Sequence, residues 1–260
     1  MYLLFRRPLF TALFIFILAV QISSCNSESK ITKREVAYVK LDSAYKNKED
    51  TSIAHFVNSY SQSLYKEMNE VLVVSDIALT KDQPESLLGN VFSDIVFEAV
   101  LNKYSKDELL KPDLCLFNNG GLRSSLPKGE ITRGKIYELM PFENEVVVVT
   151  ISGAAMKDLT QYVASAGGVP VANLKMGIKT NKPVDVFVGG KSLDLSKNYN
   201  IVTSDYLSGG GDKMTFFNNP IKITYTKLKL RDVLIEHMKE LKKNNITLTA
   251  AFDKRVYYVK

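Results

Sequence analysis

The sequence predicts a mixed domain of the α/β or α+β class, because segments with helical periodicity alternate with short segments rich in β-branched residues. The clearest helical pattern covers residues 51–69, and the clearest strand is EVVVVTIS, residues 145–152. Of the 260 residues, 45% are apolar and 24% are charged, as in an ordinary globular protein. We find no internal repeat and no low-complexity block. After removal of a leader, the length fits one large domain or two small ones.

The first half of the domain is expected to contain two strands and two helices. Residues 36–43 alternate weakly and predict a strand, and the helix over 51–69 follows it. VLVVSDIAL, residues 71–79, predicts a second strand. Residues 85–104 then predict a helix with a broad apolar face. Gly89 within it indicates close packing or a helix that begins at about that point.

The middle of the chain is expected to continue with strands and short helices. DLCLFN, residues 113–118, has the length and flanks of a buried strand. Thr132 is placed to cap a short helix that Pro141 ends. The strand over 145–152 leads into a helix over 153–166, whose apolar residues lie on one side.

The last third is expected to hold three strands, a Gly-rich loop and a helix. The strands are 183–189, 199–204 and 255–260, and DYLSGGGDK, residues 205–213, is the loop. A Lys-rich amphipathic helix is expected over 228–242.

Residues 1–24 have the pattern of an export signal, which is not part of the fold. Two arginines precede an apolar run from Leu9 to Val20, which is shorter than the roughly 20 residues of a membrane span. Without these arginines, 32 basic residues stand against 28 acidic ones. The lysines are mostly scattered and no basic stripe with aromatic residues exists, so nucleic-acid binding is not expected.

The signal ends in ISSC, which resembles a bacterial lipobox and predicts that Cys25 is lipidated. The alternative is ordinary signal cleavage beside an unrelated cysteine. Residues 25–35 are polar and predict a tether, so the domain is expected to cover residues 36–260 of an exported, lipid-anchored protein of the bacterial cell envelope, periplasmic or surface-facing. Cys115 then has no disulfide partner and is expected to be a small buried hydrophobe.

Three motifs stand out beyond their secondary structure. They are PESLLGNVFSDIV, LFNNGGLRSSLPKGEITRGKIYELMPFEN and YNIVTSDYLSGGGDKMTFF. Their order and spacing resemble those of the C-terminal domain of 5′-nucleotidases, and the resemblance covers about residues 36–260. It implies a four-layer α/β/β/α sandwich that recognises the substrate of enzymes which dephosphorylate nucleotides and related UDP-sugars.

The resemblance implies a pocket for the base and sugar of a nucleotide. Phe142 and Tyr206 match two rings that sandwich the base, and aromatic rings stack on any base. Asp212 matches an acid that takes the ribose hydroxyls, since a carboxylate accepts from both. The full set of matching residues is Asn118, Gly120, Gly121, Arg123, Phe142, Asn144, Tyr206 and Asp212.

The remaining members of this set have supporting roles. Asn118 can donate and accept along a base or sugar edge, and Asn144 matches an Asn at the base edge. Arg123 offers a planar fork suited to phosphate. Gly120 and Gly121 let the backbone approach a ligand closely.

Each residue also has a simpler interpretation. Phe142 alone would be assigned to the core, whereas Tyr206 beside three glycines is less easily assigned there. Asp212 could be a turn residue, and Arg123 could pair with a surface carboxylate. The common spacing favours the pocket.

Two departures from the family pattern bear on function. Pro84 stands where an Arg commonly precedes the E-x-x-x-G-N helix start, and Lys81 is the nearest replacement. The family's metallophosphoesterase half, which holds two metals, has no counterpart here. His55 and His237 lie in no metal-ligand motif, so we expect no catalytic residue, no metal ligand and no cofactor in this chain.

Other catalytic patterns carry little weight. Residues 63–66 and 125–128 both fit S-x-x-K, but no S-D-N or K-T-G accompanies them, and Pro127 breaks the helix that the second would require. SGGGDK lacks the spacing of a phosphate-binding P-loop.

The sequence leaves three functions open. The first is a non-catalytic subunit that presents a nucleotide to a separately encoded metallophosphoesterase, which would carry two divalent metals. The second is a lipoprotein that captures nucleosides alone. The third is a degenerate scaffold with no ligand.

Overall fold

The computed structural model describes residues 31, 33–38 and 50–260. The expected export signal, Cys25, most of the tether and residues 39–43 of the first expected strand lie outside this part. Residues 36–38 are exposed and form no strand. The chain divides into two units, Met1–Thr51 and Ser52–Lys260, and the described strands all lie in the second.

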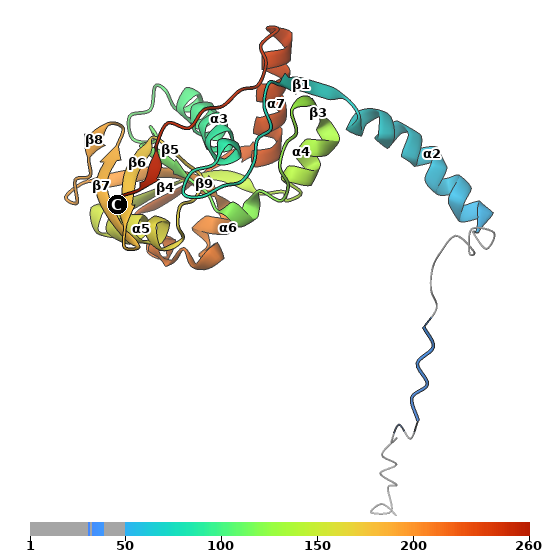
Figure 1. The fold of residues 1–260 in the computed structure, drawn as a ribbon, viewed down its shortest axis with the longest axis horizontal. Coiled ribbons are helices and arrows are strands. Elements are labelled where there is room, and N and C mark those ends of the chain that lie inside the picture. The colour runs from blue at the N-terminus through green and yellow to red at the C-terminus, as the bar shows by residue number, and fades with distance from the viewer. Residues whose placement is uncertain (1–30, 32, 39–49) are drawn as a thin grey trace, which may run out of the picture. The chain divides into compact units, whose positions relative to one another are not determined.

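Helices and strands mix along the chain, as predicted (Figure 1). The helices are α2 (Thr51–Met68), α3 (Leu87–Lys103), α4 (Arg133–Leu139), α5 (Gly153–Ser165), α6 (Asp205–Ser208) and α7 (Leu230–Lys243). The strands are β1 (Val71–Ser75), β2 (Leu114–Leu116), β3 (Gly129–Thr132), β4 (Glu145–Ser152), β5 (Val171–Ala172), β6 (Leu174–Lys179), β7 (Lys182–Val188), β8 (Lys191–Ser192), β9 (Asn198–Ser204), β10 (Lys222–Lys229) and β11 (Val256–Tyr258). Single 3-10 turns lie at η2 (Asn119–Gly121), η3 (Gly211–Lys213) and η4 (Thr215–Phe217).

The described strands form three sheets. The central sheet has the order β10-β4-β9-β2-β5, a second has the order β11-β6-β7-β8, and β1 pairs with β3. In the central sheet β2 and β9 are parallel, whereas β4 is antiparallel to both β9 and β10. This arrangement brings the ends of β2 and β9 and the start of β4 to one edge.

Helices cover the sheets on more than one side. α3 packs against β2 and β5 of the central sheet and against α7, which also contacts β1 and β10. α5 contacts β4 and β9 of the central sheet and β6 and β7 of the four-stranded sheet. In Figure 1 the central strands β4 and β9 lie between α3 and α5.

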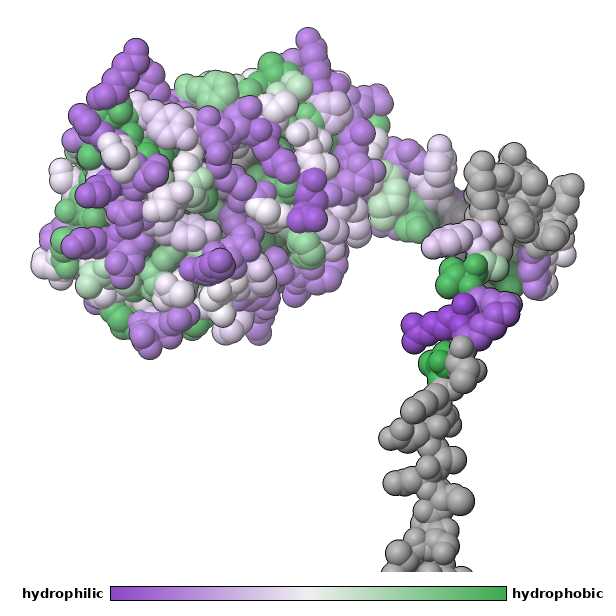
Figure 2. Space-filling view, turned by 60° about the horizontal axis from the view of Figure 1, so that its bottom comes forward, coloured by the Kyte–Doolittle hydropathy of each residue, from purple (hydrophilic) through white to green (hydrophobic). Residues whose placement is uncertain are grey.

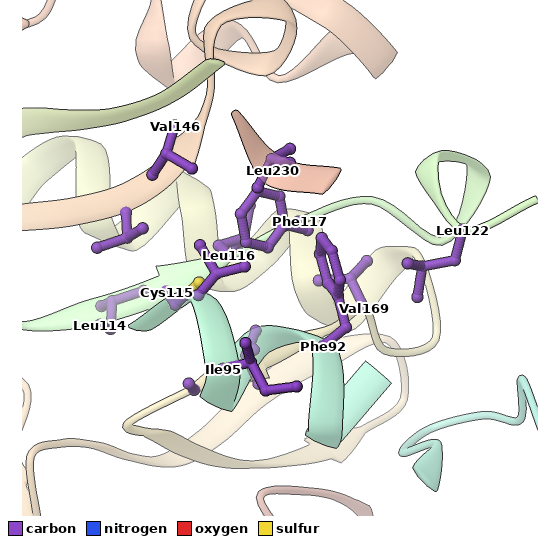
Figure 3. Packing of buried hydrophobic residues seen from close by; sticks show 14 of the residues in the cluster. Phe92, Ile95, Leu114, Cys115, Leu116, Phe117, Leu122, Val146, Val169 and Leu230 are labelled. Atoms are coloured by element: carbon purple, nitrogen blue, oxygen red, sulfur yellow. The ribbon is translucent and has the colours of Figure 1, made fainter. Parts of the chain in front are cut away.

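One part of the hydrophobic core lies between the central sheet and α3. Figure 3 shows Phe92 and Ile95 of α3 beside Leu114, Leu116 and other residues of the sheet. The rings of Phe92 and Phe117 meet edge to face with centroids 4.8 Å apart. Cys115 is fully buried and free, which confirms its predicted role, and burial raises the pKa of its thiol.

Local capping explains where the predicted helices begin. The Ser86 hydroxyl accepts from the N–H of Gly89 at 3.0 Å and starts α3. A Cβ at Gly89 would lie 2.6 Å from the Ser86 Oγ, so glycine leaves room for this cap. Thr132 caps α4 as predicted, by accepting from the N–H of Lys135.

Helix α2 forms as predicted but buries none of its residues. Phe56, Val57, Tyr60 and Leu64 are each more than half exposed, and the rings of Phe56 and Tyr60 are 5.1 Å apart. On the face of the globular part shown in Figure 2, hydrophobic residues lie in small groups among hydrophilic ones. Among the described helices, none combines the length and the apolar character that a membrane crossing requires.

Candidate functional site

The topology brings three predicted polar segments to one edge of the central sheet. Residues 118–123 follow β2, and residues 205–213 follow its parallel neighbour β9. Residues 142–144 precede β4, whose first residues pair with the last of β9 through Val146 and Ser204. Ligand sites of open sheets commonly lie at such strand ends.

Buried residues anchor the two segments that follow β2 and β9. Phe117 precedes Asn118, Leu122 precedes Arg123, and Leu207 follows Tyr206; all three anchors are at most 3% exposed. Figure 3 shows Phe117 and Leu122 near Phe92 in the core. The polar residues therefore sit on a rigid base although they lie in loops.

Asn118 and Asp212 meet across the edge. The side-chain N–H of Asn118 donates to Oδ2 of Asp212, which lies 94 residues later in the sequence. A Cβ at Gly121 would lie 2.7 Å from Oδ1 of Asn118. Gly121 therefore makes room for the side chain of Asn118, which is a role that the sequence did not indicate.

Tyr206 also reaches Asp212. Its hydroxyl donates to Oδ1 of Asp212 at 3.2 Å, and its side chain is 51% exposed. A Cβ at Gly211 would lie 2.5 Å from Cε1 of Tyr206, so the Gly-rich loop lets the ring lie against the backbone. Asp212 has a φ of 52°, in the left-handed region that Asp tolerates.

Tyr162 of α5 completes this group and was not predicted from the sequence. Its hydroxyl donates to the main-chain carbonyl of Asp212 at 3.2 Å. Burial raises the pKa of Tyr162, and the charge of Asp212 and the neighbouring Tyr206 raise it further. Tyr162 therefore stays protonated and keeps its hydrogen bond at neutral pH.

Phe142 and Asn144 lie just before β4 at the same edge. Phe142 is 43% exposed, so the alternative that it belongs to the core is wrong. Asn144 and Asn118 line one narrow cavity of about 10 Å³, which has room for about one water molecule. A nucleoside cannot enter this cavity.

Two cations lie on the β2 side of the site. Arg123 is exposed, and its Nη1 donates to the carbonyl of Gly120 at 3.2 Å. Within residues 50–260 no ion pair involves Arg123, which removes the surface-pair alternative for this part of the chain. Nζ of Lys81 donates to the carbonyl of Leu122 at 2.9 Å. The charge of Lys81 therefore lies against the residue that precedes Arg123.

Larger hollows lie elsewhere. A groove of about 1070 Å³ runs between α3 and α7 and is lined by both charged and apolar side chains. Another, of about 600 Å³, includes Arg255, whose guanidinium binds both Asp94 and Asp253. Neither hollow contains a predicted site residue.

A metal site is not evident in the described part of the chain. There, no group of three or more His, Cys, Asp or Glu side chains is arranged to hold an ion. His55 lies on α2 and His237 on α7. The expectation that this chain carries no catalytic metal stays a prediction.

The family model described as 5′-nucleotidase, C-terminal domain, matches residues 66–219, which is more than half of the chain. The chain therefore belongs to the 5′-nucleotidase C-terminal domain family. The family predicted from the three motifs is thus confirmed.

Individual relatives agree with this assignment. A 5′-nucleotidase from Vibrio vulnificus is 26% identical over 175 residues, which cover 64% of this chain and 30% of the relative. The structure of a 5′-nucleotidase precursor from Thermus thermophilus matches with a TM-score of 0.66 and 25% identity, over 82% of this chain and 44% of that chain. The NAD nucleotidase of Haemophilus influenzae shares the fold, with a TM-score of 0.59, 19% identity and coverage of 81% and 41%.

These matches confirm the predicted mixed α/β fold of the 5′-nucleotidase C-terminal type. The chain spans less than half the length of each of these relatives. The structure brings Asn118, Tyr206 and Asp212 into direct contact and leaves the ring of Phe142 exposed at the same edge. The ligand contacts assigned to these residues stay predictions.

Proposed function

We propose that this protein recognises a nucleotide or nucleoside at the edge of its central sheet. One observation carries the proposal. The carboxylate of Asp212 is held by Asn118 on one oxygen and by Tyr206 on the other, while the ring of Tyr206 stays half exposed beside it. A fixed acceptor next to an exposed ring suits a ribose joined to a base.

The chemistry of the other side chains fits this ligand. The base stacks on Tyr206 and Phe142, and the ribose hydroxyls donate to free lone pairs of Asp212. Arg123 and Lys81 lie at the β2 side, where their charges suit a phosphate. Lys81 thus supplies a charge near the position where Pro84 replaces the family's Arg.

We further infer that phosphate release requires a second protein. Among the described residues, no group of three or more His, Cys, Asp or Glu side chains is arranged to hold a metal ion. In this proposal the catalytic role belongs to a separately encoded metallophosphoesterase with two divalent metals.

The exposed apolar side of α2 supports the proposal that this protein binds a partner. The family match begins at residue 66, inside α2, and the exposed Phe56, Tyr60 and Leu64 lie just before that point. An apolar helix face of this kind is typical of contact with another chain. Its proposed occupant is the metallophosphoesterase.

Export to the cell envelope is part of the proposal. A relative from Listeria monocytogenes, whose match covers 68% of this chain, is named a cell wall protein. Together with the signal pattern of residues 1–24, this supports an exported protein, anchored by lipid on Cys25. Mass spectrometry of the envelope protein is expected to find the lipid on Cys25.

Isothermal titration calorimetry of adenosine and AMP into the purified protein tests recognition. We expect Tyr206→Ala to weaken adenosine binding by about tenfold or more, because one stacking surface is lost. Tyr225 is also exposed but lies on β10, so Tyr225→Ala is the matched control and keeps the affinity. If adenosine, AMP, uridine and guanosine all fail to bind, the chain is a scaffold and the proposal is wrong.

Phosphate release from AMP tests the division of labour. With added Mn²⁺ or Zn²⁺, the purified protein is expected to release no phosphate, because the metal ligands belong to the partner. Phosphate release that persists after repurification and is lost in Tyr206→Ala would contradict the proposal that catalysis requires a second protein. If nucleoside binding occurs and no metallophosphoesterase copurifies from the native envelope, the protein is a nucleoside-capturing lipoprotein instead.

A further inference from the structure

Arg231 is a buried cation beside the candidate site, and it is not among the predicted site residues. It is the second residue of α7 and is 7% exposed. Strand β10 leads into α7 and pairs with the start of β4 through Lys229 and Glu145. Arg231 therefore lies at the same sheet edge as the candidate site.

The guanidinium of Arg231 binds residues that lie before and after Phe142 in the chain. Its Nη1 donates to the carbonyl of Met140 at 3.3 Å, and its Nη2 donates to the carboxylate of Glu143. Its flat face lies over the ring of Tyr137 in α4, 4.1 Å from the centroid. The planar fork can thus bind two points of one loop while it stacks on the helix before that loop.

The neighbours of Arg231 hold the same loop. The N–H of Leu230 donates to the carbonyl of Asn144 at 3.0 Å, and Nζ of Lys229 donates to the carbonyl of Glu143 at 2.9 Å. Three consecutive residues, from the end of β10 to the start of α7, therefore fix the segment from Met140 to Asn144, which carries the exposed ring of Phe142.

Stability alone does not explain an arginine here. The Nε of Arg231 is buried with no hydrogen-bond partner within residues 50–260. A buried donor without a partner is unfavourable. The guanidinium is therefore better suited to fixing the loop than to stabilising the fold.

We propose that Arg231 is a positioning residue, which sets the place of the Phe142 ring and so the affinity for the base. The inference rests on the proposed stacking role of Phe142. Arg231 itself touches no ligand and acts through the loop at residues 140–144.

Adenosine affinity in matched variants tests the proposal. Arg231→Met retains a long, flexible side chain but removes both the fork and the guanidinium over Tyr137, so the affinity is expected to fall about fivefold, less than in Phe142→Ala. The side chain of Arg255 is also largely buried but binds Asp94 and Asp253, so Arg255→Met is the control and keeps the affinity. Because the side chain of Glu143 is 70% exposed, Glu143→Gln gives a second, mild variant with the same direction of change.

A double-mutant cycle separates positioning from general destabilisation. If Arg231 acts through Phe142, Arg231→Met causes no further loss of affinity in the Phe142→Ala background. An equal loss in both backgrounds would overturn the proposal, as would wild-type affinity in Arg231→Met and Glu143→Gln.

Hydrogen exchange without ligand separates this proposal from the proposed function. Arg231→Met is expected to speed amide exchange in residues 140–144, whereas Arg255→Met leaves these amides unchanged. If the wild-type protein binds no nucleoside, the proposed function fails, and the positioning role in binding fails with it. Unchanged exchange in a protein that does bind adenosine would overturn the positioning role alone.

Discussion

Asp113 illustrates how burial acts on a single residue away from the candidate site. Its carboxylate is half-buried just before β2 and accepts from the N–H of Asn200 at 2.8 Å. Burial is the largest influence and raises the pKa of Asp113, although the bond from Asn200 and the charge of Lys111 lower it. Ionisation of this carboxyl is therefore less favourable in the folded chain than in the unfolded chain.

This shift predicts a pH-dependent effect of Asp113→Asn. Because the folded pKa is raised above 3.8, the stability that Asp113 contributes is present below the unfolded pKa and is lost as pH rises through the folded pKa. The variant cannot ionise and still accepts from Asn200. Its stability relative to wild type, measured by urea unfolding at pH 3, 5 and 7, should rise with pH. A relative gain towards acid would contradict this sign.

The side chains of the candidate site were identified by motif, but their contacts were not. Asn118 and Asp212 are 94 residues apart, and no local pattern indicates that they share a hydrogen bond. Tyr162 and Arg231 lie in helices whose sequences have ordinary amphipathic patterns. Their roles depend on which strands pair, so no local sequence signal points to either residue.

At the scale of elements, helices were predicted better than strands. The helices expected over 51–69, 153–166 and 228–242 match α2, α5 and α7 to within about two residues. Each has a 3.6-residue apolar pattern, which is a local property of the sequence. The strand expected over 71–79 ends at Ser75, and Leu79 instead forms an isolated bridge with Leu126.

Several strands have too weak a local signal. β10, KITYTKLK, is an edge strand with exposed lysines, so it lacks the apolar run of a buried strand. β6 contains Gly177, where a Cβ would lie 2.7 Å from the side chain of Val259. Glycine weakens a strand pattern, although here it permits close packing against the C-terminal segment.

At the scale of the whole molecule, the site depends on the order of the central sheet. Three loops from distant parts of the chain meet because β2 and β9 run parallel while β4 runs antiparallel to β9. Sequence periodicity indicates the mixed class but not this order, since pairing partners lie far apart in the sequence, as Leu114 and Ile201 do. The motif resemblance supplied the missing information, and the family match and the structural neighbours confirm the family and fold.

The location of a bound nucleoside tests the central claim most directly. We would determine a crystal structure of the protein with adenosine. We predict the base against the rings of Tyr206 and Phe142, with the ribose hydroxyls on Asp212. Adenosine bound in the groove between α3 and α7, or beside Arg255, with the edge of the central sheet empty, would contradict this claim.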